Sequence, residues 1–222
     1  MDYRASLLMT QLVTHDVRHY IVERPEGLAF EAGQGVMLAL DRPGWREIRR
    51  PFTPTSLPRD RVLEFTIKTY PEHEGLTREL HHTEPGAEVL LSRPFGTLTY
   101  RGPGTFIAGG AGVTPFLAML RELAHSNRLG GHQLIYANRT SADIIDPQEL
   151  RHYLGEHCHF LCSEAGGALC DASGLVDRDY LAQIIGTTDQ AFYVCGPPGF
   201  VTAVTGALSE LGASSEAVLF ES

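Results

Sequence analysis

Residues 105–125 read TFIAGGAGVTPFLAMLRELAH and join a short apolar run to a longer helical pattern through a glycine-rich turn. The glycines allow the backbone to approach a ligand, while Thr114 and Pro115 suit the N-cap and the first position of a helix. Exposed N–H groups and the helix dipole would then face an anion. A tight turn from strand to helix without a ligand explains the same residues equally well, so this motif alone leaves both interpretations open.

The segments after this turn repeat the alternation of apolar run and helical pattern up to the end of the sequence. Such alternation is typical of a parallel sheet with helices on both faces. A second turn of the same design occurs in YVCGPPGF, residues 193–200. We expect both turns at the carboxyl ends of parallel strands, where open sheets bind ligands. The predicted strands are 105–109, 132–138, 159–164, 191–196 and 217–222, and the predicted helices are 114–125, 146–154, 176–185 and 197–211.

Residues before 103 show the period of strands instead. In VLEFTIKTY, residues 62–70, apolar Leu63, Phe65 and Ile67 alternate with polar residues, as in a half-buried strand. Similar runs between Gly and Pro turns favour an antiparallel barrel. The predicted strands are 17–23, 35–41, 62–70, 87–92 and 96–100, with one helix at 74–82.

The two parts also differ in charge. The chain of 222 residues has a net charge of -9, and residues 1–102 hold 13 Arg and Lys against 14 Asp and Glu, whereas residues 103–222 hold 5 against 13. We therefore predict two domains: an antiparallel β-barrel over 1–102 and an α/β parallel-sheet domain over 103–222. The acidic total argues against nucleic acid as a partner, because that affinity depends on Lys and Arg contacts with phosphate.

The remaining composition favours a cytoplasmic protein without a membrane or a metal. No apolar run reaches the roughly 20 residues that span a bilayer, and the N-terminus MDYRASLLMTQLVTH lacks a signal-peptide pattern. The histidines at 81–82 and 152–160 lack a ligand set with metal spacing, so we assign no metal. The cysteines fit neither zinc nor iron–sulfur spacing, and we expect reduced thiols. These cysteines are Cys158, Cys162, Cys170 and Cys195.

Six separated motifs, in this order and spacing, resemble the ferredoxin–NADP reductase family of flavoproteins, in particular its stand-alone flavodoxin- and ferredoxin-reductase-like members. The motifs are RPFTPTS (50–56), IKTY (67–70), EGLT (74–77), GGAGVTP (109–115), NRT (138–140) and CGPPG (195–199). The resemblance implies that the barrel binds flavin, as FAD rather than FMN, and that the α/β domain binds NADH or NADPH as co-substrate.

On the flavin side, the resemblance implies that Arg50 holds the flavin phosphate, Phe52 stacks near the flavin and Thr53 approaches flavin N5. A guanidinium presents a fork of donors to phosphate, and a hydroxyl can hydrogen-bond to the nitrogen that accepts hydride. We expect Arg49 to face solvent, because strand alternation points it away from Arg50. The resemblance adds as flavin contacts Pro51, Ile67, Lys68, Tyr70, Gly75, Leu76 and Thr77. Plain barrel core remains open for Ile67, and a strand-end aromatic for Tyr70.

On the nucleotide side, the resemblance assigns two turns and a ribose site. Arg139 could pair with a 2′-phosphate, whereas Asp143 could take a free 2′-hydroxyl, so these two cues conflict. The run N-R-T-x-x-D-I resembles NADH-using relatives and favours NADH. The implied nucleotide contacts are Gly110, Gly112, Thr114, Pro115, Asn138, Arg139, Thr140, Asp143, Cys195, Gly196 and Pro197.

The C-terminal VLFES, residues 218–222, matches a region near the flavin ring in the family. The resemblance implies a flavin contact for Phe220 and proton traffic for Glu221, although a solvated chain end explains these residues equally well. The catalytic residues implied by the resemblance are Thr53, Cys195 and Glu221.

The expected activity is that of an NAD(P)H-dependent FAD oxidoreductase, in which hydride passes from the nicotinamide to FAD and electrons pass on to a separate acceptor. The acceptor is expected to be a ferredoxin, a flavodoxin, an oxygenase component or a small molecule. The arginines at 42, 46, 49, 59, 61 and 93 suggest that an acidic carrier docks on the barrel, with a solvated surface as the alternative. The competing function is a non-catalytic flavin- and nucleotide-binding subunit for redox sensing or regulation.

Overall fold

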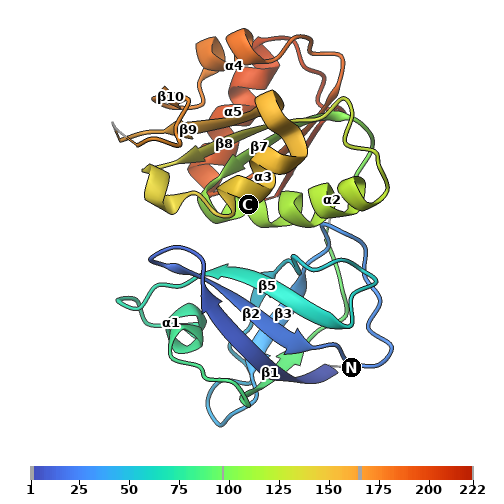
Figure 1. Ribbon diagram of the computed structural model, residues 1–222, viewed down its shortest axis with the longest axis vertical. Coiled ribbons are helices and arrows are strands. Elements are labelled where there is room, and N and C mark those ends of the chain that lie inside the picture. Colours follow the sequence, from blue (N-terminus) through green and yellow to red (C-terminus); the bar gives the residue numbers. More distant parts are fainter. Residues whose placement is uncertain (1–2, 97, 165–166, 222) are drawn as a thin grey trace. The chain divides into compact units, whose positions relative to one another are not determined.

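The computed structural model describes residues 3–96, 98–164 and 167–221. The chain divides into two compact units, Met1–Gly96 and Thr97–Ser222, which are described one at a time (Figure 1). Within the described residues, none of the helices combines the length and the apolar character needed to cross a bilayer.

The first unit is an antiparallel sheet with one short helix. Its strands follow the order β4-β3-β6-β1-β2-β5, and every neighbouring pair is antiparallel. The elements are β1 (Tyr3–Leu12), β2 (Val17–Glu23), β3 (Val36–Leu40), β4 (Arg50–Phe52), β5 (Val62–Lys68), α1 (Leu76–His81) and β6 (Glu88–Leu91).

Contacts between the two outer strands of this sheet bring it close to a closed barrel. Pro54, just after β4, forms an antiparallel bridge with Phe65 of β5. The Thr55 N–H donates to the Glu64 carbonyl at 2.7 Å, and the Glu64 N–H donates to the Ser56 hydroxyl at 3.0 Å. The predicted antiparallel barrel is therefore confirmed.

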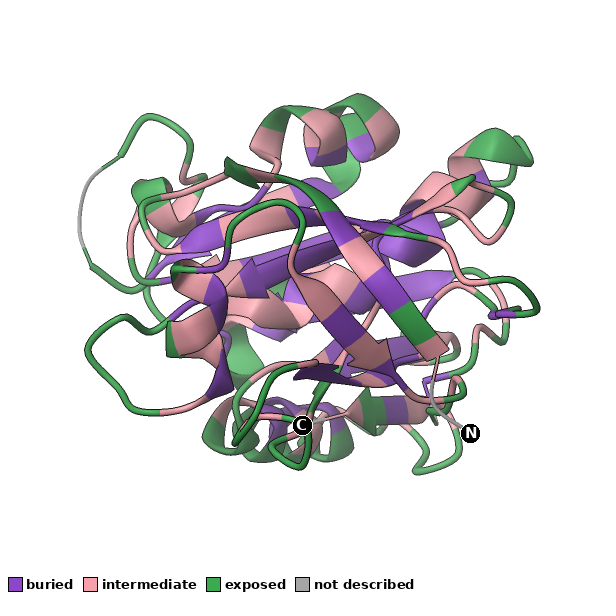
Figure 2. Ribbon diagram, turned by 90° about the horizontal axis from the view of Figure 1, so that it is seen from below, coloured by how far each residue is buried: buried purple, intermediate pink, exposed green. Residues whose placement is uncertain are grey.

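The core of this unit consists of the alternate strand residues that point inward. Leu63, Phe65 and Ile67 of β5 are almost fully buried, as their period of two predicted. Leu76 and Leu80 of α1 pack against the same core. Figure 2 shows buried residues, in purple, concentrated on strands and exposed residues, in green, concentrated on loops.

The second unit is a six-stranded parallel sheet in the order β10-β9-β8-β7-β11-β12. All six residues of β7 are buried, as expected when helices cover both faces of a parallel sheet. The elements are β7 (Gly104–Gly109), α2 (Thr114–His125), β8 (Gln133–Asn138), α3 (Pro147–Leu154), β9 (Cys158–Cys162), β10 (Ala172–Ser173), α4 (Arg178–Ile184), β11 (Ala191–Cys195), α5 (Pro198–Glu210) and β12 (Val218–Glu221), with 3-10 turns at Gly110–Val113, Ser141–Asp143 and Gly155–His157.

Helices lie on both faces of this sheet (Figure 1). On one face, Phe116 of α2 packs on Phe106 of β7 with ring centroids 5.0 Å apart. On the other face, Ile107 of β7 joins a core that includes Leu181 of α4 and Val204 of α5. Successive residues of β7 thus pack against helices on opposite faces of the sheet, which confirms the predicted α/β domain.

Four expectations about strands need correction, among them β10, which has only two residues and was not predicted. No strand forms at Gly96 or at residues 98–100, while residue 97 lies outside the described residues. Tyr100 instead stacks on Tyr193 with ring centroids 6.1 Å apart, because this segment is anchored to the second unit through aromatic contacts. Strands β1 and β4 were not predicted: β1 carries a register shift between Leu7 and Met9 that hides its alternation, and β4 has only three residues.

Candidate functional site

Two glycine turns lie side by side at the carboxyl edge of the parallel sheet. β7 and β11 are neighbours, with Ala108 in register with Cys195, and each strand leads through glycine into a helix. A Cβ added at Gly112 would lie 2.3 Å from the Cys195 carbonyl oxygen, and one added at Gly196 would lie 2.8 Å from Phe200 Cδ1. The first turn therefore packs backbone against backbone at Gly112, and the second packs closely on the Phe200 ring at Gly196, so both positions require glycine.

The helix after the first turn begins differently from the sequence prediction. Val113, not Thr114, occupies the N-cap position of α2, and Pro115 lies in the second helical position rather than the first. The reason is that the 3-10 turn Gly110–Val113 runs directly into α2, and Val113 at its end already has right-handed helical backbone angles. The Thr114 hydroxyl donates back to the Ala111 carbonyl at 3.0 Å and caps no N–H group.

Cys195 and Glu221 are brought together at this edge by neighbouring strands. They are register partners of β11 and β12. Burial raises the pKa of the Cys195 thiol to about 12, with a further contribution from the negative charge of Glu221. Burial also raises the pKa of Glu221, whose Oε2 is buried without a hydrogen-bond partner among the described residues. The pair therefore presents a protonated thiol and a carboxyl group that holds its proton more tightly than usual.

The end of the chain is an ordered strand as far as Glu221. Phe220 is 56% exposed although it lies inside β12. The alternative of a solvated chain end is therefore wrong for Glu221, which is half-buried, whereas the terminal Ser222 lies outside the described residues.

The predicted ribose-reading residues follow β8. Asn138 ends that strand with only 8% exposure, and neither atom of its amide has a hydrogen-bond partner among the described residues. The Asp143 carboxylate accepts bonds from the Thr140 N–H at 2.9 Å and from the Thr140 hydroxyl at 2.7 Å. Asp143 thus shapes its own turn rather than standing free to receive a ribose hydroxyl.

A residue that sequence reasoning missed neutralises Arg139. Glu164, just after β9, accepts from Arg139 Nη2 at 2.7 Å and from Arg139 Nε at 3.1 Å. This partner raises the pKa of Arg139, through the hydrogen bond first and the charge second. The two residues are 25 positions apart in the sequence, and the parallel pairing of β8 with β9 brings them together. No local motif therefore indicates this ion pair.

In the first unit the predicted phosphate ligand Arg50 is exposed. Its Nη1 donates to the Arg49 carbonyl at 3.0 Å, and no carboxylate among the described residues pairs with it. Arg49 is half-buried, so the expectation that Arg49 is the solvent-facing neighbour is wrong. The strand alternation used for it does not apply, because β4 begins only at Arg50. Phe52 packs partly against the barrel core, beside Pro51 and half-buried Thr53.

The other predicted flavin contacts have mixed surroundings. Ile67 is 2% exposed and belongs to the barrel core, which favours its structural interpretation. Lys68 Nζ lies 2.8 Å from an Asp16 carboxylate oxygen. Tyr70 lies beyond β5, is 43% exposed and stacks on His73 with ring centroids 5.8 Å apart.

The EGLT motif forms the start of α1, as predicted. Gly75 takes φ 143°, a backbone conformation that other residues rarely adopt, and no atom stands within 4 Å of where its Cβ would be. Leu76 is buried in the core and Thr77 is half-buried, so it is the backbone of this turn that remains available to a ligand.

These surroundings fit the two cofactors that the resemblance implies. An exposed guanidinium without a carboxylate partner suits a phosphate, and the positive φ of Gly75 suits close approach of a ligand to the backbone. At the sheet edge, the buried unpartnered Glu221 oxygen and the Asn138 amide are polar groups that a nucleotide could satisfy.

Two of the four cysteines form a disulfide, so the expectation of four reduced thiols is wrong. Cys162 and Cys170 are bonded, with Cα atoms 5.9 Å apart, whereas Cys158 and Cys195 are free. The reason is that the chain turns back after β9, where the Asp171 N–H donates to the Phe160 carbonyl at 2.8 Å. This return brings Cys170 beside Cys162, and the spacing of the cysteines in sequence does not reveal it.

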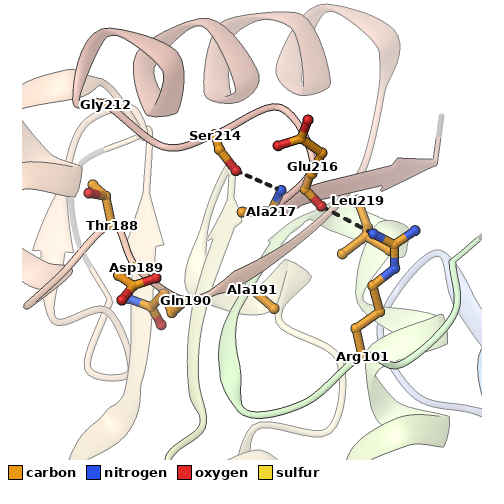
Figure 3. Close-up of a pocket in the computed structure, with 10 residues that line it drawn as sticks. All are labelled: Arg101, Thr188, Asp189, Gln190, Ala191, Gly212, Ser214, Glu216, Ala217 and Leu219. Atoms are coloured by element: carbon orange, nitrogen blue, oxygen red, sulfur yellow. Dashed lines mark hydrogen bonds between the residues drawn. The ribbon is translucent and has the colours of Figure 1, made fainter.

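A cavity of about 370 Å³ opens at the opposite, amino edge of the same sheet (Figure 3). Arg101 borders it and donates to the Glu216 carbonyl at 3.1 Å, and Asp189 and Gln190 line it before β11. None of the predicted site residues contributes to this cavity. It is therefore separate from the edge that carries the two glycine turns.

Two family descriptions match nearly the whole chain in sequence. Residues 4–100 match "Oxidoreductase FAD-binding domain", and residues 106–206 match "Oxidoreductase NAD-binding domain".

Known proteins with similar sequences include two reductases. The chain is 26% identical over 221 residues to the ferredoxin–NAD(P)(+) reductase component of the naphthalene 1,2-dioxygenase system of Pseudomonas putida, covering 96% of this chain and 66% of that protein. It is 35% identical over 156 residues to ferredoxin–NADP reductase B of Sorangium cellulosum, covering 67% of this chain and 63% of that protein. The chain thus spans just under two thirds of the length of these relatives.

Solved structures share the fold. The FAD/NAD-binding domain of nitric oxide dioxygenase from Vibrio cholerae aligns with a TM-score of 0.87 at 21% identity, covering 99% of this chain and 97% of that one. A ferredoxin NADP+ reductase from Neisseria gonorrhoeae, solved with bound FAD and NADP, aligns with a TM-score of 0.86 at 20% identity, covering 99% and 98%. With both domain families matched in this order, the chain belongs to the ferredoxin reductase-like family of FAD- and NAD(P)-binding oxidoreductases.

Proposed function

We propose that this protein oxidises NADH, with NADPH as the poorer substrate, reduces FAD and passes the electrons to a separate acceptor. FAD would be held by residues 1–102 and the nucleotide by residues 103–222. The observation that carries the proposal is the pairing of Cys195 with Glu221 beside the backbone contact of Gly112 at one sheet edge. This edge supplies a shaped, partly buried surface for a nicotinamide ring.

The cofactors supply the chemistry when bound, since flavin accepts a hydride from nicotinamide and releases electrons to an acceptor. The protein's own part is positioning. Cys195, with a pKa of about 12, stays a neutral thiol at physiological pH and offers a small polarisable contact rather than a nucleophile. Gly112 and Gly196 permit this contact, because a Cβ at Gly112 would meet the Cys195 carbonyl oxygen and a Cβ at Gly196 would meet the Phe200 ring.

Glu221 is the group in this region that can hold a proton. Burial raises its pKa, so its carboxyl keeps a proton on Oε2 or Oε1 to a higher pH than an exposed glutamate does. In the barrel, Arg50 would bind the phosphate and the Thr53 hydroxyl would donate to flavin N5. These roles rest on the family resemblance together with the exposure of Arg50.

The preference for NADH is supported by the pairing of Arg139 with Glu164. A 2′-phosphate would have to compete with this carboxylate for the guanidinium. A nucleotide with a free 2′-hydroxyl brings no such charge, and the Glu164 carboxylate could accept a hydrogen bond from it.

Anaerobic addition of NADH tests the proposed activity. The flavin absorbance band should bleach with one equivalent of NADH, and reoxidation should follow when an acceptor is added. A flavin that stays oxidised would contradict the proposal and favour a non-catalytic regulatory subunit.

For the acceptor, we propose a separate acidic carrier of the ferredoxin or flavodoxin type, or an oxygenase component. Two of the arginines suggested for docking are neutralised, since Arg42 pairs with Glu79 and Arg46 pairs with Asp41. Arg61 and Arg93 are exposed, and no carboxylate among the described residues pairs with either. We therefore propose that the acidic carrier docks on Arg61 and Arg93.

Charge reversal at these two positions tests the docking surface. The double variant R61E/R93E should reduce an acidic ferredoxin more slowly at low salt and lose the salt dependence of that rate, while bleaching by NADH stays unchanged. The control is Arg128→Glu, an exposed arginine of the second unit. Equal rates in the double variant and the wild type would favour a small-molecule acceptor.

A further inference from the structure

The described residues of the loop closed by the Cys162–Cys170 disulfide, 162–164 and 167–170, lie against the predicted ribose-reading residues at several points. The Ser163 N–H donates to the Asn138 carbonyl at 2.9 Å, and the Glu164 N–H donates to the Arg139 carbonyl at 2.8 Å. These two bonds continue the pairing of β8 with β9 beyond the strand ends, and Glu164 follows two residues after Cys162, which is paired with Asn138 at the end of β9.

The far side of the same loop touches the turn that follows Arg139. A Cβ at Gly167 would lie 2.2 Å from the Ser141 hydroxyl oxygen, and Gly167 takes φ 155°. Ser141 belongs to the 3-10 turn that Thr140 and Asp143 cap together. The loop therefore approaches the predicted ribose site from both of its arms, and the disulfide joins those arms eight residues apart.

The disulfide can affect how readily the ion pair between Glu164 and Arg139 forms. Both side chains are largely exposed, at 53% and 78%. An exposed pair contributes little by itself, because solvent screens it and two long side chains must be ordered to form it. Restricting the loop lowers that ordering cost, and releasing the loop restores it.

We propose that the Cys162–Cys170 disulfide is a redox-sensitive modification site that sets how strongly the protein discriminates against a nucleotide 2′-phosphate. In the oxidised protein the closed loop holds Glu164 on Arg139 and disfavours the phosphate. In the reduced protein Glu164 is less restrained, and Arg139 becomes available to the phosphate. The inference rests on the proposed nucleotide site at Arg139.

The chemistry requires a dithiol reductant of the thioredoxin class. Cys170 is partly exposed whereas Cys162 is buried, so a thiolate of the reductant attacks the Cys170 sulfur. A mixed disulfide forms at Cys170, and Cys162 leaves as a thiolate that takes up a proton. The second thiol of the reductant then displaces Cys170, so two electrons and two protons pass from the dithiol to the protein, and the reductant becomes a disulfide.

Nicotinamide-free nucleotides test the proposal without turnover. Binding of 2′,5′-ADP and of 5′-ADP is measured by calorimetry on the oxidised holoprotein and after treatment with a dithiol. Thiol counting in denaturant verifies the states, with two thiols expected before reduction, Cys158 and Cys195, and four after it. We expect reduction to raise the affinity for 2′,5′-ADP relative to that for 5′-ADP about two- to fivefold, which is the scale of the contribution of an exposed ion pair.

Two variants separate this effect from general damage by the reductant. Cys170→Ser should show the reduced-state ratio of affinities without treatment and should not respond to dithiol. Cys158→Ser, which leaves the disulfide intact, should respond as the wild type does. An affinity ratio that stays constant while the thiol count rises from two to four would overturn the proposal, as would four thiols in the air-oxidised protein. Failure of both nucleotides to bind in either state would instead contradict the proposed nucleotide site itself.

Discussion

The two glycines at the predicted cofactor turns, Gly112 in the second unit and Gly75 in the first, are required for opposite reasons. At Gly112 there is no room, since an added Cβ would lie 2.3 Å from the Cys195 carbonyl oxygen. At Gly75 there is open space, and the requirement comes from the backbone angle, φ 143°. One turn is thus built by close packing within the protein, and the other is left open to a ligand.

The same contrast extends to the side chains of the two predicted sites. Asn138, Cys195 and Glu221 are buried or half-buried at the edge of a parallel sheet, whereas Arg50 and Tyr70 are exposed. Because Asn138 and Glu221 are part of the packing of their unit, changing them should alter the stability of that unit as well as nucleotide binding. Changes at the exposed flavin residues Arg50 and Tyr70 should mainly affect ligand binding.

The largest effect is expected for Gly112→Ala. Overpacking of backbone against backbone cannot be relieved by a side-chain rotation, so the free energy of unfolding of the second unit should fall by about 3 kcal/mol. Chemical denaturation checks this against Gly206→Ala in α5, where an added Cβ meets open space and stability should rise by up to about 1 kcal/mol. Equal stabilities in the two variants would contradict the conclusion that close packing requires glycine at position 112.

Arg50→Ala should leave the fold intact and weaken the binding of FAD. Removing a charged donor to a phosphate costs about 1.5–3 kcal/mol of binding free energy. Titration of the apoprotein with FAD measures the effect, with Arg128→Ala as an exposed arginine of the other unit. If both variants retain FAD equally well, Arg50 is not the phosphate ligand.

Glu164→Gln should change the choice of nucleotide by a smaller factor. Without the carboxylate, Arg139 can turn to a 2′-phosphate, and the ratio of KM for NADPH to KM for NADH should fall about two- to fivefold. Steady-state kinetics check this beside Glu156→Gln, an exposed glutamate in the turn before β9. An unchanged ratio would show that the Arg139–Glu164 pair does not select the nucleotide.

The smallest effect is expected for the pH dependence of stability in Glu221→Gln. The pKa of Glu221 is raised by burial, so the wild type carries its full stability below the ordinary value of 4.5 and loses part of it as the pH rises through the raised pKa. Glutamine does not ionise and avoids that loss. The melting temperature of the variant relative to the wild type should therefore be higher at pH 8 than at pH 4, and a difference independent of pH would contradict the burial of this carboxyl.

The elements of the second unit other than the two-residue β10 were predictable because each carries its own local signal. Residues 114–125 form the predicted helix with the expected limits, and the two glycine turns lie at carboxyl ends of neighbouring parallel strands, as predicted. The FAD- and NAD-binding domains implied by the motifs are confirmed. The residue roles and the domain boundary at 102 stay predictions.

What the sequence could not show depends on contacts between distant segments. Glu164 meets Arg139, and Cys170 meets Cys162, only because strands pair and the chain turns back. The Thr114 cap was wrong because a 3-10 turn precedes α2 and ends in helical backbone at Val113, and no residue in that motif distinguishes such a turn from an ordinary N-cap. Local motifs thus predicted the site residues, while the ion pair at Arg139 depends on tertiary structure.

The most direct test of the central claim, that the nicotinamide is positioned at Cys195, is the rate of flavin bleaching by NADH in Cys195→Ala, measured by anaerobic stopped flow. The variant should retain FAD and bleach about 10- to 100-fold more slowly than the wild type, because a misplaced ring loses its reactive geometry. Cys158→Ala, which removes the other free thiol, should bleach at the wild-type rate. Wild-type bleaching in Cys195→Ala would contradict the claim.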